Sequence, residues 1–391
     1  MLKSNKMLVL ILALGVFGIM NTEMGVVGIL PMVAEQYDIT VSHAGLFVSL
    51  FALVVAISGP ILPMVFSGVN RKKVMLISLG VFVLGNIVSV FATSFNVALI
   101  ARIIPAFFHP VYCSLALTVA ATSAKNPEEA RKAVTTIIMG VSAGMVLGVP
   151  IMTYIANVSS VEMAMVFSTI VNVIAFIATL FLISSMPVKE KVSYGTQLGV
   201  LRKPLTWISL FTIIFMTAAL AGTNSYTTEY LGKVTHISGN TISTVLFLYG
   251  VATIFGNILA GKLLSKNPMK TALLFPILMG VIYIIWFFTG EFIIPMIITM
   301  VIYGVMFAIQ NNINQYWITS AIPEAPDFAN GLFVSSSNWG ISIGTAVGGL
   351  FLTGMGIEHI VWNGILFLLL CFVSISIRYI IFHPARQLSK Q

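Results

Sequence analysis

Charged residues are scarce in this chain. Only 8% of its 391 residues are Asp, Glu, Lys or Arg, whereas 58% are hydrophobic, and the mean hydropathy is +1.02. A soluble domain carries about 25% charged residues. So few charges cannot cover a surface that faces water, which excludes a soluble globular protein and indicates that lipid surrounds most of the chain.

Cysteine is scarce as well. The two cysteines, Cys113 and Cys371, both lie within apolar runs and are far apart in the sequence. They form no CxxC pair, so we expect them to be packing residues rather than part of a disulfide framework or a metal site.

Sequence patterns for enzymatic chemistry are missing. There is no HExxH pattern and no Walker loop. Gly140, Ser142 and Gly144 match GxSxG, but a nucleophile elbow needs a strand, a turn and a helix with histidine and acid partners. This stretch lies inside an apolar run. We therefore expect no enzyme, no cofactor, no bound metal and no self-contained ATP-driven pump.

Long apolar segments fill the chain. A bilayer core of about 30 Å needs roughly 20 apolar residues per helical span, and lipid cannot satisfy the backbone of single spans that are not helical. The sequence therefore predicts an all-α membrane protein with twelve transmembrane helices. The expected spans are 7–33, 43–66, 73–93, 96–121, 134–157, 161–184, 205–228, 238–264, 270–290, 292–320, 329–353 and 359–382.

The basic residues fall on one side of these spans. If the N-terminus is cytoplasmic, the outer loops hold Lys233 alone, and Arg102 lies inside a span. This distribution follows the positive-inside rule, so we expect both termini in the cytoplasm, and the net charge of +8 needs no nucleic acid partner. The inner loops and termini hold the other eighteen of the 20 basic residues: Lys3, Lys6, Arg71, Lys72, Lys73, Lys125, Arg131, Lys132, Lys189, Lys191, Arg202, Lys203, Lys262, Lys266, Lys270, Arg378, Arg386 and Lys390.

One long polar segment, residues 185–204, divides the spans into two groups of six. It predicts a cytoplasmic linker between an N-terminal half, 1–184, and a C-terminal half, 205–391. The basic loop SGVNRKK of the first half has a counterpart in GKLLSKNPMK of the second. The sequence thus predicts two six-helix repeats, an arrangement typical of transporters.

A glycine ladder supports the repeat. Gly140, Gly144 and Gly148 recur 200 residues later as Gly340, Gly344 and Gly348. Glycines four residues apart let two membrane helices approach closely. The first ladder ends at Pro150, and proline removes a backbone hydrogen bond and bends a helix. We predict that Gly140, Gly144, Gly148 and Pro150 belong to a gating helix; ordinary tight packing is the alternative.

The first half holds ionisable residues inside its spans. Glu23 stands in the stretch NTEMGVVGILP and is the sole acidic residue in the interior of any predicted span. Such residues are costly in lipid and usually mark ion or substrate pathways. Arg102 lies at a similar depth in the fourth span, and His109 follows seven residues later on the same helix face. We predict that these three residues handle protons; a structural ion pair and a packing histidine are the alternatives.

The second half is rich in amides instead. The tenth span carries QNNINQYW, whose five amide side chains cover an arc of about 200° on a helix. Amides facing lipid would be costly, so we expect the lining of a wet cavity; a hydrogen-bond network between helices is the alternative. The candidate substrate contacts come from this stretch, from NSY and SSSNWG in the seventh and eleventh spans, and from the residues before Glu23: Asn21, Thr22, Asn224, Tyr226, Gln310, Asn311, Asn314, Gln315, Trp317, Asn338 and Trp339.

Four stretches give the chain a resemblance to a known family. NTEMGVVGILP, LIARIIPAFF, GVSAGMVLGVP and IPEAPDFANGLFVSSSNWGISIGTAVGG resemble the first-helix, arginine-bearing fourth-helix, antiporter fifth-helix and eleventh-helix patterns of the major facilitator superfamily. The resemblance spans the whole chain and is closest to bacterial proton-coupled efflux proteins for arabinose, other sugars and purines. It departs from the family pattern at Ser67 and Gly68, where Asp-Arg is usual, at Ser265, where Asp is common, and at Pro105, where a small residue is typical.

The resemblance implies a secondary transporter. We expect a monomer in the bacterial cytoplasmic membrane that exports a small organic solute in exchange for protons by alternating access. A sugar, a nucleoside or purine, and a drug all remain open as the solute, and the single buried acid with many amides favours a neutral or cationic polar-aromatic compound. A proton-coupled uptake symporter on the same fold and a non-transporting membrane scaffold or sensor are the alternatives.

Overall fold

The computed structural model describes residues 5–66, 68–187, 197–323 and 326–382. Within these ranges the elements are all helical and include no β-strand, which confirms the predicted all-α fold. The elements are α1 (Asn5–Met24), η1 (Gly25–Ile29), α2 (Leu30–Gln36), α3 (Val41–Ala44), α4 (Leu46–Val65), α5 (Arg71–Val90), α6 (Phe95–Ala106), α7 (His109–Thr122), α8 (Pro127–Val158), α9 (Val161–Leu182), η2 (Gln197–Arg202), α10 (Pro204–Ser225), α11 (Thr227–Lys233), α12 (Gly239–Lys266), α13 (Pro268–Thr289), α14 (Ile293–Ala321), α15 (Pro326–Met355), η3 (Ile357–His359) and α16 (Val361–Phe382).

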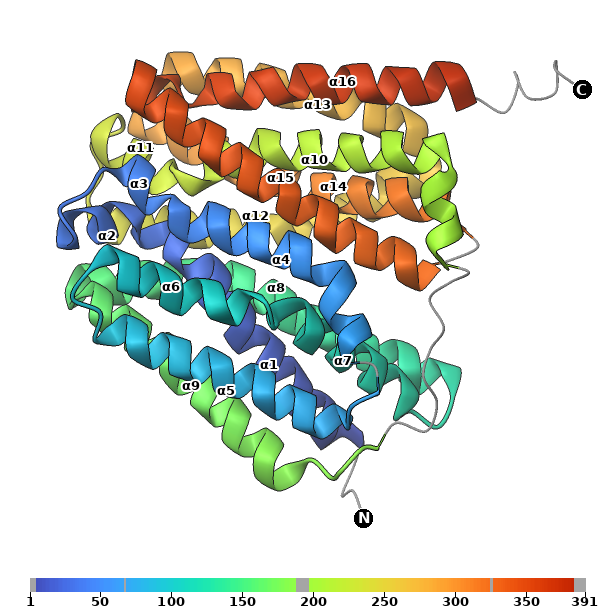
Figure 1. Ribbon diagram of the computed structural model, residues 1–391. Helices are drawn as coiled ribbons and strands as arrows, with labels where there is room; N and C mark the ends of the chain where they lie inside the picture. Colours follow the sequence, from blue (N-terminus) through green and yellow to red (C-terminus); the bar gives the residue numbers. More distant parts are fainter. Residues whose placement is uncertain (1–4, 67, 188–196, 324–325, 383–391) are drawn as a thin grey trace, which may run out of the picture. The chain divides into compact units, whose positions relative to one another are not determined.

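The chain divides into two compact units. Figure 1 shows the helices coloured along the sequence, from blue at the N-terminus to red at the C-terminus. The first unit holds residues 1–40 and 46–192, and the second holds 41–45 and 193–391. The short helix α3 therefore belongs with the second unit, where it packs against α15. Of the predicted linker 185–204, residues 188–196 lie outside the described part of the chain.

Eleven helical stretches in the described part of the chain are long and apolar enough to cross a membrane. The remaining predicted span, 329–353, corresponds to α15, a helix of 30 residues. At a rise of 1.5 Å per residue this length exceeds the roughly 30 Å of a bilayer core. Its glycines and serines lower its hydropathy, as expected for a helix packed against other helices rather than lipid.

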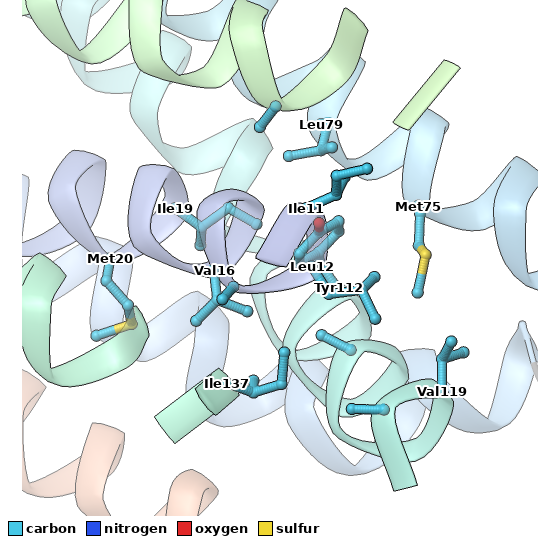
Figure 2. Close-up of a cluster of buried hydrophobic side chains, with 14 of the residues drawn as sticks. Ile11, Leu12, Val16, Ile19, Met20, Met75, Leu79, Tyr112, Val119 and Ile137 are labelled. Atoms are coloured by element: carbon cyan, nitrogen blue, oxygen red, sulfur yellow. The ribbon is translucent and has the colours of Figure 1, made fainter. Parts of the chain in front are cut away.

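The hydrophobic core of the first unit is built around α1. Figure 2 shows Leu12, Val16 and Ile19 of this helix among side chains of neighbouring helices, including Leu79 and Tyr112. All five of these side chains have no exposed surface. An apolar helix without a polar face lies in a protein core or spans a membrane, and α1 contacts α7, α8 and α9.

Prolines explain the interruptions of two spans in the first unit. α1 changes into the 3-10 segment η1 before α2 begins, and Pro31 occupies the first turn of α2. A proline cannot donate to the carbonyl four residues earlier, and its ring collides with that carbonyl. Between Pro105 and Pro110, α6 likewise ends and α7 begins.

The predicted repeat is present in the structure. Asn70 caps α5 by accepting hydrogen bonds from the N–H groups of Lys72 and Lys73, at 3.1 and 3.4 Å. Asn267 caps α13 in the same way, accepting from Lys270 N–H at 3.0 Å. The helix pairs also match, since α8 packs on α1 in the first unit and α15 packs on α10 in the second.

Candidate functional site

Glu23 lies at the end of α1, where the helix changes into η1. Its side chain is only 5% exposed, and its Oε2 atom is 3.3 Å from Nε2 of His109. His109 is the first residue of α7, and a helix N-terminus carries a partial positive charge that favours a nearby carboxylate. Two of the three predicted proton-handling residues are therefore in contact.

Arg102 reaches the same point from α6. Its Nη2 atom donates to the backbone carbonyl oxygen of Thr22 at 3.0 Å and to that of Glu23 at 3.3 Å. Carbonyls at a helix end lack partners within the helix. The guanidinium therefore supplies hydrogen bonds to the carbonyls at the end of α1. Arg102 thus binds the Glu23 segment through its backbone, which differs from the structural ion pair that the sequence left as an alternative.

Aromatic rings shield this arginine. The guanidinium carbon lies 5.2 Å from the ring centre of Phe47 and 5.6 Å from that of Phe51, both in α4. Such cation–π contacts stabilise a desolvated guanidinium. The ring of Phe51 is also 6.3 Å from that of His109. No sequence pattern distinguishes these phenylalanines, because aromatic residues are common throughout the spans.

Asn21 and Thr22, predicted as substrate contacts, bind neighbouring helices in the structure. Asn21 Nδ2 donates to Ser168 Oγ at 2.8 Å, and Thr22 Oγ1 accepts from Asn172 at 3.0 Å and from Asn86 at 3.1 Å. All of these side chains are buried. The polar residues before Glu23 therefore fix the position of α1 against α5 and α9.

The glycine ladder of α8 faces α1. A Cβ atom placed on Gly144 would lie 2.6 Å from Cβ of Met20, and one on Gly148 would lie 2.8 Å from Oδ1 of Asn21. Gly140 likewise approaches the backbone of Ala13. The ladder therefore brings α8 directly against the helix that carries Glu23. α8 itself continues as a helix through Pro150, and its gating role stays a prediction.

Two of the predicted amides in the second unit hold helices together. Gln310 and Asn314 of α14 both donate to Oγ1 of Thr217 in α10, each at 3.0 Å. Both side chains are buried. For these two residues the geometry corresponds to the hydrogen-bond network between helices that the sequence left as an alternative.

Trp317 packs against a buried arginine. The guanidinium carbon of Arg378 lies 4.0 Å from the centre of the Trp317 ring, and its Nη1 donates to the Trp317 carbonyl at 2.7 Å. Arg378 also donates to Ser209 and Ser320, at 2.9 Å each. The prediction that Arg378 lies in an inner loop is wrong: it is a residue of α16 with 8% exposure. A cation near the last turn of α14 complements the negative end of that helix.

The other predicted substrate residues differ in partners and in exposure. Tyr226 donates its hydroxyl to the Thr345 carbonyl at 3.1 Å, and Asn338 donates to the Val334 carbonyl of its own helix at 3.0 Å. Asn224 and Asn311 are partly exposed, whereas Gln315 and Trp339 are exposed. Among the described residues, no group of three His, Cys, Asp or Glu side chains could hold a metal ion.

Two helical units of the same design, with a buried charged group at a helix break, define a membrane transporter built from parallel repeats. The chain matches the profile of the Major Facilitator Superfamily over residues 12–345 and 210–390, and it belongs to this family. It is therefore a transporter of a small-molecule substrate and not an enzyme. Its relatives and its apolar helices indicate a multi-pass protein of the bacterial inner membrane.

Relatives cover nearly the full length of the chain. The uncharacterized MFS-type transporter YtbD of Bacillus subtilis (strain 168) is 32% identical over 375 residues, which cover 93% of this chain and 92% of the relative. A probable sugar efflux transporter of Helicobacter pylori (strain P12) is 24% identical and covers 92% of this chain and 91% of its own. The crystal structure of the nucleoside transporter NupG matches the fold with a TM-score of 0.75, at 16% identity, over 97% of this chain and 100% of the other.

Proposed function

We propose that the protein exchanges protons for a small, uncharged organic solute and exports that solute from the cell. The observation that carries the proposal is the contact of Glu23 with His109 at the break in α1, beside the guanidinium of Arg102. A buried carboxylate with a titratable neighbour is a group that can take up and release a proton. The single such group in the span interiors is the natural coupling site.

Arg102 and burial act on Glu23 in opposite directions. A positive charge nearby favours the carboxylate, whereas removal from water favours the protonated acid. A change in the packing around the break in α1 alters both effects, so proton affinity changes with conformation. Binding of the solute and of the proton to different conformations then couples their movements reciprocally.

Similarity to transporters of sugars and nucleosides supports the solute class. The relative from Helicobacter pylori is named as a probable sugar efflux transporter, and the structural neighbour NupG as a nucleoside transporter. Both kinds of solute are polar and uncharged, in keeping with the partly exposed amide of Asn224 in the second unit. The antiporter-like stretch GVSAGMVLGVP favours export over uptake.

Liposomes with an imposed pH difference test the proposal. Purified protein is reconstituted with an acidic interior, and accumulation of labelled L-arabinose, D-glucose and uridine is measured. Exchange predicts accumulation driven by protons leaving the liposome, up to roughly 100-fold for two pH units and one proton per solute. Accumulation only with an acidic exterior would indicate an uptake symporter, and no accumulation with either gradient would favour a scaffold or sensor.

The Glu23→Gln variant tests the coupling residue. We expect it to lose gradient-driven accumulation while it still equilibrates solute between the two sides, because a glutamine cannot carry a proton. Glu35→Gln, which removes an exposed carboxylate from α2, serves as the matched control and should behave as the parent. Undiminished accumulation by Glu23→Gln would show that Glu23 is structural and would leave His109 as the next candidate.

A further inference from the structure

The glycine ladders align the two units residue by residue. The α8 glycines approach α1 at Ala13, Phe17 and Asn21, and the α15 glycines approach α10 at Ile214, Ala218 and Gly222. The step between equivalent contacts is 201 residues each time (214 − 13, 218 − 17 and 222 − 21). The same step relates Glu23 to Asn224. It also relates the helix ends, since α1 stops at Met24 and α10 stops at Ser225.

The neighbours of Glu23 have counterparts as well. α6 begins at Phe95 and α14 at Ile293, a step of 198 (293 − 95) that relates His109 to Phe307 and Arg102 to Met300. The same step relates Phe51 to Tyr249. The ring pairs confirm this alignment. Phe51 and His109 lie 6.3 Å apart with an interplanar angle of 58°, and Tyr249 and Phe307 lie 6.0 Å apart with an angle of 59°.

Glu23, Arg102 and His109 of the first unit thus each have an uncharged counterpart in the second unit. Asn224 stands for the carboxylate, Phe307 for the imidazole and Met300 for the guanidinium. Hydroxyls also bind α10, but one helical turn before the counterparts of the carbonyls that Arg102 binds: Tyr283 donates to the Ala219 carbonyl at 2.7 Å and Tyr303 to the Leu220 carbonyl at 2.8 Å. The second unit keeps the arrangement of the ring pair but has no ionisable side chain at these three positions.

Among the described residues, several polar groups at this place have no hydrogen-bond partner, including those of Tyr249, Thr223 and Trp286. The hydroxyl of Tyr249 is buried and makes no hydrogen bond, and the partly exposed side chain of Asn224 makes none to any described residue. A buried hydroxyl without a partner costs free energy unless a ligand or water binds it. The Tyr249 ring stacks on that of Tyr303 with their centres 5.8 Å apart, and the Tyr303 hydroxyl donates to the Leu220 carbonyl, one helical turn before Asn224.

We infer that this uncharged counterpart of the Glu23 group binds the solute, with the Asn224 amide and the Tyr249 hydroxyl as its polar contacts and the surrounding rings as its apolar walls. The inference rests on the proposed function and divides it between the units: protons bind in the first and the neutral solute binds in the second. An amide, a hydroxyl and aromatic faces suit a sugar or a nucleoside, since they donate and accept hydrogen bonds and stack without attracting either sign of charge.

Equilibrium binding to the purified full chain tests this assignment. The probes are labelled uridine, D-glucose and L-arabinose as neutral compounds, with benzoate and tetraphenylphosphonium as an anion and a cation. We expect at least one neutral probe to bind, and Tyr249→Phe and Asn224→Ala to weaken it about three- to tenfold each, the usual effect of one hydrogen bond. Tyr154→Phe and Asn240→Ala, which change exposed residues of α8 and α12, are matched controls and should bind as the parent.

The Glu23→Gln variant separates this inference from the proposed function. Binding of the neutral probe should persist within twofold in Glu23→Gln, even though accumulation driven by the pH difference is lost. Binding lost in Glu23→Gln but kept in Tyr249→Phe and Asn224→Ala would place the solute in the first unit and overturn the inference. Binding of charged probes alone, or of no probe, would overturn the solute class.

Discussion

Arg102 serves two purposes at one position. It donates to two backbone carbonyls at the break in α1, and it places a positive charge near Glu23. Replacing it with alanine leaves both carbonyls without this donor and leaves the carboxylate buried without a compensating charge. Breaking a buried charge interaction from one side costs about 3–5 kcal/mol.

We therefore expect Arg102→Ala to lower the thermal unfolding temperature strongly in detergent, and Glu23→Gln combined with Arg102→Ala to recover part of that loss. The recovery follows because glutamine removes the stranded charge but not the unsatisfied carbonyls. A scan of the parent, both single variants and the double variant measures the coupling. No recovery in the double variant would show that the carbonyl bonds alone matter.

At the residue scale, the sequence identifies the ionisable side chains that are costly inside a span, but it does not identify the hydrogen-bond partners of the amides. Glu23, Arg102 and His109 are predicted to handle protons because ionisable groups are costly inside a span; the structure places Glu23 and His109 in contact, and the proton role stays a prediction. The sequence predicts that Gln310 and Asn314 line a cavity. In the structure both amides donate hydrogen bonds to the same partner, Thr217. No periodicity reveals which hydroxyl an amide will meet across a helix interface.

At the scale of helices, the close contact between α8 and α1 gives a sharp prediction. Leucine at Gly144 must push α8 away from Met20 and the carbonyl of Phe17, since a Cβ there already lies 2.6 and 3.1 Å from them. Overpacking of this kind costs about 1–3 kcal/mol. We expect folded protein with lost or leaky transport for Gly144→Leu and Gly148→Leu, measured in the same liposome assay.

Gly280→Leu is the control for this prediction. Apart from the nearby backbone of its own helix, no atom lies within 4 Å of a Cβ built on Gly280 in α13, so transport should stay normal. Normal transport in both ladder variants would mean that the glycines provide packing only.

Helix positions followed from the sequence, but their interruptions did not. The sequence predicts a continuous first span over 7–33, whereas in the structure α1, η1 and α2 share these residues. Pro31 was a usable signal, as were Pro105 and Pro110 in the fourth span. A hydropathy pattern does not register such breaks, because the residues stay apolar while the hydrogen-bonding pattern changes.

At the scale of the whole molecule, orientation in the membrane is the property to test. The basic residues predict that both termini and the 185–204 linker face the cytoplasm. A reporter that is active only in the cytoplasm should work after Gln391 or within the linker. It should fail in the loop 234–238, between α11 and α12. Activity in that loop would refute the predicted topology.

The carboxylate in one unit and the amide at the matching place in the other have an electrical consequence. If the solute is neutral and one proton returns for each molecule exported, every turnover moves one positive charge into the cell. Membrane voltage then drives the cycle together with the pH difference, at about 2.3 kcal/mol per charge for 100 mV. An inside-positive potential imposed on liposomes at equal pH should therefore drive solute accumulation by the parent and not by Glu23→Gln. Such a protein keeps exporting when the medium is as alkaline as the cytosol, a condition in which an electroneutral exchanger comes to rest.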